Sequence, residues 1–332
     1  MRSFALGVLA AIAVLAGASP ASAAPALQVI GKDFTFPHRL DGFPAKLSDF
    51  PELEINSFVT NDGVRLSYWE AGKGRPLIFV PGWSANGAEY INVMALLSKS
   101  YRVIVLDPRN QGLSQRVTYG GRIERFSMDL KQLVDHLGIR QADMCGWSMG
   151  AAVVWGYIDL FGTKSIRKAC FVDEPISIYA HDDWSEQERL DAGGSTTSAE
   201  RMVAGFTGKG PLNALITDLK PLERSQARDS LYFVNSEAFA TAVVTNDPSA
   251  TARVLFDHVT NDWRDVLQNK INVPTAIFTG TESNNLPSQR WAASAIPGAT
   301  LYVYSKAEQG DHFLMFKNPV KFANDLRRFL ER

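Results

Sequence analysis

Short, mainly apolar segments that each stop at a turn residue constrain the fold of this 332-residue chain more than any other feature. Each segment is too short for a typical helix, and strands buried on both faces of a parallel sheet have this uninterrupted apolar character. Segments with helical periodicity separate them, at residues 123–137, 149–160 and 320–330. Strands that alternate with helices predict an α/β fold with a mostly parallel central sheet and helices on both of its faces. The apolar segments cover residues 77–80, 102–106, 144–145, 169–172, 275–278 and 301–304.

The alternation of strands and helices divides the chain into an arm, a core and an insertion. Residues 24–54 have no clear period and are expected to form an N-terminal arm on the surface. Residues 55–175 and 271–332 form the predicted core, which begins with an antiparallel hairpin that turns at Asp62-Gly63. Residues 176–270 contain helical patterns and no convincing strand, so they predict a helical cap. An insertion of this length at the carboxyl edge of a parallel sheet is well placed to cover a ligand crevice.

The first 23 residues have the pattern of a secretory signal peptide. Arg2 is followed by an apolar run over residues 4–16 and by Ala21-Ser22-Ala23, a small-x-small cleavage signal. The run is too short to span a bilayer comfortably. We therefore expect cleavage after Ala23 and a secreted or periplasmic protein. An uncleaved membrane anchor is the alternative interpretation.

Composition and charge argue against nucleic acid as a partner. Hydrophobic residues make up 45% of the chain, charged residues 21%, and the formal net charge is -1. These values are typical of a soluble globular enzyme, and without a basic block nucleic acid is not an expected partner. No other segment predicts stable membrane insertion, and no particular oligomeric state is predicted.

The two cysteines are expected to be buried free thiols. Cys145 and Cys170 fall within predicted buried, parallel strands, where a disulfide bridge would be strained.

The strongest chemical signal is Gly146-Trp147-Ser148-Met149-Gly150, a G-x-S-x-G run between a predicted strand and a predicted helix. In that context the serine stands on a sharp turn, and its hydroxyl projects from the sheet edge as a nucleophile. The alternative is that Ser148 is only a helix N-cap. A serine nucleophile needs a base, and His312 lies on a loop between the last predicted strand and the last helix. The remaining histidines are expected to be surface or otherwise satisfied side chains: His38, His136, His181 and His258.

These motifs resemble the α/β-hydrolase superfamily over residues 55–332. Residues 80–83, Val-Pro-Gly-Trp, resemble its oxyanion loop, with Pro81 where histidine is more usual. Residues 107–114 resemble a structural D-x-R-G-x-G-x-S turn, with Asn110 where glycine is commoner. The resemblance implies that the backbone N–H groups of Trp83 and Met149 form an oxyanion hole. The rings of Trp83 and Trp147 are expected to line the substrate pocket.

The position of the acid departs from the commonest pattern of the superfamily. Many relatives carry an aspartate in a Gly-x-x-Asp context after a later strand, but here that position is Ser283, and Glu282 is one residue out of register. Pancreatic-type lipases and zearalenone-type lactone hydrolases instead place the acid about 24 residues beyond the nucleophile. Asp173 lies 25 residues beyond Ser148. Asp173 is therefore the predicted acid, with Glu282 and Glu174 as alternatives.

The predicted function is a secreted serine hydrolase that cleaves carboxylic esters or lactones of medium-sized apolar substrates through an acyl-enzyme. No metal or organic cofactor is expected, because the sequence has no His/Cys/Asp cluster with ligand spacing. A cofactor-free perhydrolase, a C–C hydrolase or an acyltransferase would use the same triad. A non-catalytic binding protein on a hydrolase scaffold is the alternative from another class.

Overall fold

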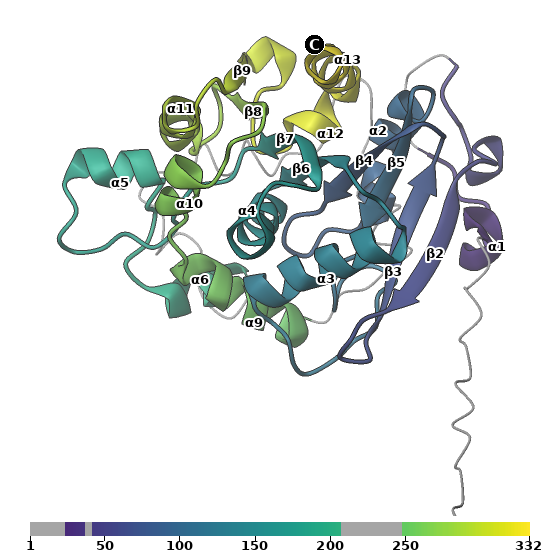
Figure 1. Cartoon of the computed structure of the whole chain (residues 1–332), viewed down its shortest axis with the longest axis horizontal. Helices are drawn as coiled ribbons and strands as arrows, with labels where there is room; N and C mark the ends of the chain where they lie inside the picture. The colour runs from purple at the N-terminus through teal and green to yellow at the C-terminus, as the bar shows by residue number, and fades with distance from the viewer. Residues whose placement is uncertain (1–23, 37–41, 207–247) are drawn as a thin grey trace, which may run out of the picture.

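The computed structural model describes residues 24–36, 42–206 and 248–332 (Figure 1). The predicted signal peptide at residues 1–23 lies outside these ranges, as do His38 and the part of the predicted cap between residues 207 and 247. None of the helices in the described ranges has the length and apolar character needed to cross a bilayer.

A nine-stranded sheet with the order β1-β2-β3-β5-β4-β6-β7-β8-β9 forms the centre of the molecule. The first three strands pair antiparallel, and β3 joins β5 in the same way. From β5 to β9 every pair is parallel, which confirms the predicted mostly parallel sheet. The strands are β1 Ala24–Pro25, β2 Glu54–Val59, β3 Arg65–Ala71, β4 Arg75–Val80, β5 Tyr101–Leu106, β6 Ala142–Trp147, β7 Ile166–Val172, β8 Thr275–Gly280 and β9 Thr300–Tyr304.

The apolar segments alternate their side chains between two hydrophobic clusters, one on each face of the sheet. In β4, Phe79 belongs to one cluster and Ile78 to the other, and both side chains are fully buried. Because neither face meets water, such a strand needs no polar residues, which explains the uninterrupted apolar runs in the sequence. Cys145 and Cys170 are neighbours in the register of β6 and β7, and both are buried free thiols, as expected.

Helices cover both faces of the sheet (Figure 1). One face carries α1 Ala26–Ile30, α2 Ile91–Leu97, α12 Leu314–Lys317 and α13 Pro319–Glu331. The other face carries α3 Ile123–His136, α4 Met149–Phe161, α10 Arg264–Asn269 and α11 Leu286–Ala295. Short 3-10 helices lie at Leu47–Asp49, Gly87–Tyr90 and Lys306–Glu308. The sequence periodicity indicated α3, α4 and α13 but did not indicate α2 or α11.

The N-terminal arm is more deeply packed than its sequence indicated. Ala24 and Pro25 pair with β2 as an edge strand, and the side chains of Ala26, Leu47 and Leu53 are each 1% exposed. The arm has neither helical nor strand periodicity over most of its length. Its burial depends on contacts with the core that a local pattern does not encode.

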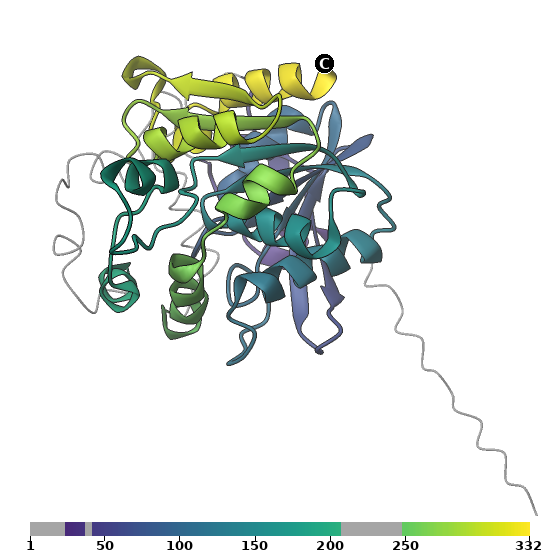
Figure 2. The same cartoon turned by 60° about the vertical axis from the view of Figure 1, so that its left-hand side comes forward.

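The described part of the insertion between β7 and β8 is helical. It contains α5 Glu186–Ala192, α6 Ala199–Phe206, α9 Pro248–Thr260 and α10. Helices α6 and α9 lie side by side (Figure 2) and share an apolar cluster of Ala199, Met202, Leu255 and Val259. The only β pairing in the described part of this insertion is an isolated bridge between Tyr179 and Thr196.

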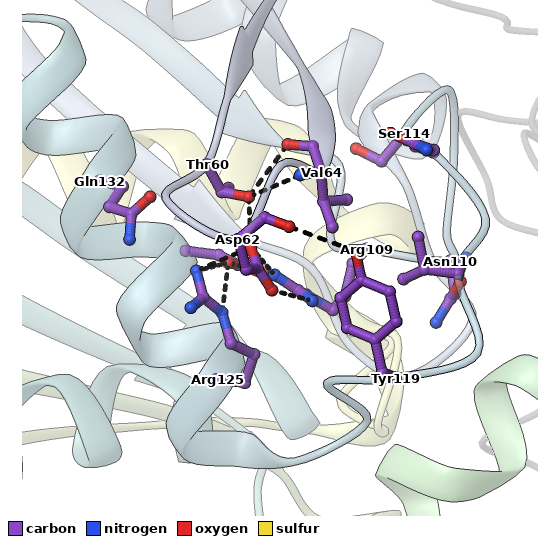
Figure 3. Close-up of polar contacts among 12 residues, drawn as sticks. Thr60, Asp62, Val64, Arg109, Asn110, Ser114, Tyr119, Arg125 and Gln132 are labelled. Carbon is purple, nitrogen blue, oxygen red and sulfur yellow. Dashed lines mark hydrogen bonds and ion pairs between the residues drawn. The ribbon is translucent and has the colours of Figure 1, made fainter.

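A buried ion-pair network anchors the turn that follows β5 (Figure 3). The guanidinium of Arg109 is fully buried and contacts Asp129 at 2.6 Å and Asp62 at 3.0 Å. Arg125 contacts the same two carboxylates. Asn110, at the position where glycine is commoner in the superfamily, has a φ of 67°. Asparagine tolerates this left-handed conformation better than most residues, which explains the replacement.

We predict that Arg109→Met destabilises the protein by about 3 kcal/mol, because it leaves the buried carboxylate of Asp129 with one cation fewer. The matched control is Lys131→Met, which removes an exposed pair with Asp135 and should cost less than about 1 kcal/mol. Urea unfolding followed by tryptophan fluorescence measures both. Equal, small losses in the two variants would contradict this structural role of Arg109.

Candidate active site

Ser148 occupies a strained turn between β6 and α4. Its backbone has a φ of 52° and a ψ of -138°, which only a tightly constrained non-glycine residue adopts. The turn is crowded, since a Cβ on Gly150 would lie 2.0 Å from the carbonyl oxygen of Val80. Ser148 does stand at the N-cap position of α4, but its side chain makes no capping hydrogen bond. Its hydroxyl is instead directed to a histidine.

That histidine is His312, on the loop between β9 and α12. Its Nε2 lies 3.1 Å from the Ser148 Oγ. Hydrogen bonds on both sides of His312 help to hold the loop. The indole Nε1 of Trp147 donates to the carbonyl oxygen of His312 at 2.8 Å, and the carboxylate of Asp311 accepts from the backbone nitrogen of Phe313 at 2.8 Å. The imidazole is therefore oriented by residues from both β6 and its own loop.

Asp173 completes the arrangement from the end of β7. Its Oδ2 lies 2.8 Å from Nδ1 of His312. Because a carboxylate only accepts, Nδ1 donates to Asp173, and Nε2 is left to accept from Ser148. Trp147 and Val172 are partners in the β6–β7 register, so Ser148 and Asp173 follow at equivalent heights on adjacent parallel strands. Both ring nitrogens of His312 are thus engaged, Nδ1 by Asp173 and Nε2 by Ser148.

The buried Asp173 carboxylate accepts further hydrogen bonds from the segment around the end of β8. The hydroxyl of Thr279 donates to Oδ1. The hydroxyl of Ser283 and the amide of Asn285 donate to Oδ2 at 2.7 and 3.2 Å. Ser283 is the residue at the superfamily's common acid position, and here it supports an acid on the neighbouring strand. Sequence reasoning identified the position but not this contact.

The electrostatics of the site favour a charged His312. Burial by itself lowers the pKa of the imidazole, but the hydrogen bond and negative charge of Asp173 act in the opposite direction. The carboxylates of Glu174 and Asp311 add to the effect of Asp173. The net result is a His312 pKa above its ordinary value of 6.5.

The predicted oxyanion donors lie on either side of Ser148. Met149 is the first residue of α4, where backbone N–H groups have no carbonyl partner within a helix. Trp83 follows Gly82, whose Cα lies so close to Ser148 that an added Cβ would be 2.9 Å from the Ser148 Cβ. The loop after β4 therefore passes directly beside the serine.

Gln111 holds the loop after β4, and sequence reasoning did not find it. This fully buried side chain donates to the carbonyl oxygens of Gly82 and Ala85 at 3.0 and 2.8 Å. Its Oε1 accepts from the backbone nitrogen of Ser84 at 3.1 Å. The sequence assigned the turn of residues 107–114 a structural role, and through Gln111 that turn shapes the loop of the predicted oxyanion hole.

The two tryptophans predicted to contact substrate differ in placement. Trp147 is 4% exposed, and its ring packs on His312 with centroids 5.3 Å apart, so it offers little surface to a ligand. Trp83 is partly exposed and packs against the α6–α9 cluster. Its indole Nε1 donates to the carbonyl oxygen of Thr251 in α9 at 2.9 Å. Trp83 therefore joins the predicted oxyanion loop to the cap.

The other described histidines lie elsewhere. His136 is exposed on α3 and stacks on Phe58. His181 packs between the rings of Tyr179 and Trp184. His258 is buried in α9 beside Glu174. Within residues 24–36, 42–206 and 248–332, no group of three or more His, Cys, Asp or Glu side chains could hold a metal ion.

A polypeptide with this sheet order, a serine at the β6–α4 turn and a histidine after β9 has the architecture of an α/β hydrolase. The family model described as "alpha/beta hydrolase fold" matches residues 75–319, and the chain belongs to this family. Its curated relatives include a non-heme chloroperoxidase of Kitasatospora aureofaciens, 27% identical, where the match covers 82% of this chain and 98% of the relative. A non-heme haloperoxidase of Rhodococcus erythropolis is 32% identical, with 76% and 92% covered.

Solved structures share the fold. An esterase of Exiguobacterium antarcticum superposes with a TM-score of 0.67 at 20% sequence identity, and the match covers 83% of this chain and 99% of the esterase. The fold expected from the sequence is confirmed. The chain belongs to the α/β-hydrolase family, and helices cover both faces of its mostly parallel sheet.

We predict that His312 titrates above pH 6.5 and that Asp173→Asn lowers its pKa, because the hydrogen bond and charge of Asp173 are the main causes that raise it. NMR titration of the imidazole signals measures the shift, with His312→Gln used for assignment. Asp135→Asn makes the same chemical change at an exposed site on α3 and should leave the His312 titration where it is. An unchanged His312 titration in folded Asp173→Asn would refute the coupling.

Proposed function

We propose that this protein is a serine hydrolase that cleaves carboxylic esters or lactones of medium-sized apolar substrates through an acyl-enzyme on Ser148. The observation that carries the proposal is the continuous chain of hydrogen bonds from Ser148 Oγ through His312 to Asp173. A serine hydroxyl becomes nucleophilic when a neutral imidazole can take its proton and a carboxylate can stabilise the resulting imidazolium.

The reaction would proceed in two acyl-transfer steps. His312 takes the Ser148 proton as Oγ attacks the carbonyl carbon, and the negative charge develops on the carbonyl oxygen between the N–H groups of Met149 and Trp83. His312 then protonates the leaving alkoxide, which departs as an alcohol or, for a lactone, remains within the same acyl chain. In the second step His312 takes a proton from water, and the hydroxide attacks the acyl carbon. The bond from that carbon to Ser148 Oγ then breaks, His312 returns its proton to Oγ, and the carboxylic acid leaves. Only neutral His312 is a base, so the rate should fall as the pH drops through its raised pKa.

The apolar character of the described cap supports the substrate class. Trp83, Ile178 and Val203 pack against the α6–α9 cluster. A cap with an apolar interior beside the loop of Trp83 is compatible with an apolar acyl or alcohol group more than with a peptide or a highly charged substrate.

Perhydrolysis is a second candidate function, and the similarity to a non-heme chloroperoxidase and a non-heme haloperoxidase favours it. If hydrogen peroxide replaces water in the second step, the acyl-enzyme yields a peroxycarboxylic acid and free Ser148. The peroxycarboxylic acid then oxidises halide to hypohalous acid and is itself reduced to the carboxylic acid. The same side chains serve both reactions.

We also propose that the protein is exported to the periplasm or the medium after cleavage behind Ala23. The charged start, the apolar run and the small residues of the first 23 positions support this proposal. N-terminal sequencing of the mature protein checks the cleavage site.

We predict that Ser148→Ala lowers kcat with p-nitrophenyl acetate, butyrate and octanoate by about 10⁵-fold or more. Asp173→Asn should lower it by up to about 10⁴-fold, because the His312 tautomer is no longer held. Glu282→Gln is the matched control and should retain activity. Loss in Glu282→Gln with Asp173→Asn intact would transfer the acid role to Glu282, and a folded, inactive wild type would favour the non-catalytic alternative.

For the second candidate, we expect bromination of monochlorodimedone by the wild type only when a carboxylic acid, peroxide and bromide are all present. Ser148→Ala should abolish it. Bromination that persists in Ser148→Ala would exclude an acyl-enzyme route. Ester hydrolysis without any bromination would leave water as the acceptor.

A further inference from the structure

The side chain of Gln111 reaches from the turn after β5 into the loop after β4, and both of its polar atoms have partners there. Nε2 donates to the carbonyl oxygens of Gly82 and Ala85 at 3.0 and 2.8 Å. Oε1 accepts from the backbone nitrogen of Ser84 at 3.1 Å. These partners fix the orientation of the buried amide, because a flipped amide would turn its oxygen toward two carbonyl oxygens.

One of these hydrogen bonds acts on the peptide group that carries the Trp83 N–H. The carbonyl oxygen of Gly82 and the N–H of Trp83 belong to the same planar peptide unit. None of the peptide bonds in the described residues is cis, so these two groups point in opposite directions. A donor that fixes the direction of the Gly82 carbonyl therefore also fixes the direction of the Trp83 N–H.

The same contact strengthens the Trp83 N–H as a donor. Hydrogen bonds in a protein interior polarise one another, so a donor on the carbonyl oxygen of a peptide group makes the N–H of that group more positive. The Gly82 carbonyl oxygen also accepts from the backbone nitrogen of Ala85 at 3.2 Å. The side chain of Gln111 and the backbone of Ala85 thus polarise this peptide group together.

Gln111 also holds the chain on the other side of Trp83. Ser84 has a left-handed backbone with a φ of 63°. A non-glycine residue keeps this conformation only where its surroundings enforce it. The hydrogen bond from the Ser84 nitrogen to Gln111 is one such contact. Gln111 therefore holds both the residue before Trp83 and the residue after it.

The turn that carries Gln111 is a firm base for these contacts. The buried carboxylate of Asp107 accepts from the backbone nitrogen of Leu113 in the same turn at 2.7 Å. It also accepts from the backbone nitrogen of Gly87, just beyond the loop after β4, at 2.7 Å. The turn and the loop are thereby fixed to each other by Asp107 as well as by Gln111.

We propose that Gln111 is a positioning residue for the acyl-transfer reaction: its amide orients and polarises the peptide group between Gly82 and Trp83, so that the Trp83 N–H stabilises the oxyanion that forms in both steps. The inference rests on the proposed function. The effect belongs mainly to the transition state, because the carbonyl oxygen of a bound substrate carries less negative charge than the oxyanion.

Gln111→Met tests the proposal, because it removes the amide and keeps the length of the side chain. With p-nitrophenyl butyrate, kcat per site labelled by a fluorophosphonate should fall roughly tenfold to a hundredfold, and KM should stay within about twofold of the wild-type value. Removal of an oxyanion-hole donor costs a factor of about 10²–10³. The expected loss is smaller because the Trp83 N–H itself remains.

A trifluoromethyl ketone gives a second readout, since Ser148 adds to its carbonyl carbon, His312 takes the serine proton and an oxyanion forms. Its inhibition constant should rise in Gln111→Met by about the factor by which kcat falls, because both depend on oxyanion stabilisation. Selective ¹⁵N labelling of the seven tryptophans reports the Trp83 amide. Its proton should move downfield when the adduct forms on the wild type, and less so in Gln111→Met.

Ser114→Ala is the matched control. Ser114 is a buried residue of the same turn, and its hydroxyl donates to the carbonyl oxygen of Asp107 at 2.6 Å. The change weakens the turn but leaves the hydrogen bonds of Gln111 to the loop after β4 in place. It should lower the stability of the protein and keep both kcat per labelled site and the inhibition constant at wild-type values.

Gln111→Asn is the second variant. Its amide is one carbon shorter and cannot reach Gly82, Ser84 and Ala85 together, so it should show losses of the same kind. An unchanged kcat per labelled site in a folded Gln111 variant overturns the proposal. A lower kcat with an unchanged inhibition constant also overturns it, because a purely structural role predicts that result.

The wild type decides the matter if neither Gln111 variant folds. A Trp83 amide proton that does not move when the adduct forms overturns the proposal, and a downfield shift supports it. A folded wild type that is neither labelled by the fluorophosphonate nor able to hydrolyse the esters contradicts the proposed function instead.

Discussion

The buried carboxylate of Asp173 is the constraint on which the rest of the site depends. A fully buried carboxylate is stable only when donors surround it, and here they come from the end of β8, the loop beyond it and the loop of His312. The backbone nitrogen of Asp173 also donates a hydrogen bond to the carbonyl oxygen of Phe278 in β8, at 2.9 Å. The position of His312, and through it the environment of Ser148, therefore follows from the parallel pairing of β7 with β8.

Backbone strain collects at the same edge of the sheet. The non-glycine residues with positive φ among the described residues are Ser84, Asn110, Ser148, Asp173 and Gln309. They follow β4, β5, β6, β7 and β9, at the carboxyl ends of the parallel strands. Each such residue costs on the order of 1–3 kcal/mol, and the strain persists because the packed sheet below determines the course of the chain. The strained residues thus include Ser148 and Asp173, which both contact His312 at this edge.

The cap is joined to this edge by specific polar contacts as well as by apolar packing. Helix α9 accepts a hydrogen bond from Trp83 and receives the Glu174 carboxylate at His258, and Asp257 accepts from the first backbone nitrogen of α3 at 2.8 Å. A displacement of this helix would therefore disturb the predicted oxyanion loop and the surroundings of the acid together. Helix α9 therefore links these two parts of the site structurally.

The sequence by itself determined the parallel sheet, the turn that carries Ser148 and the loop that carries His312, because strand burial and turn chemistry are recorded in local patterns. It also indicated Asp173, through the resemblance to relatives that place the acid about 24 residues beyond the serine, and the structure places Asp173 beside His312 at the end of β7. The packing of the arm, the support of Gln111 under the loop of Trp83, the donors around Asp173 and the pairing of Glu174 with His258 were decided only by the tertiary structure. Ser283 and Asp173 are 110 residues apart along the chain. No local pattern reports such a contact, because folding alone brings the ends of the two strands to the same edge.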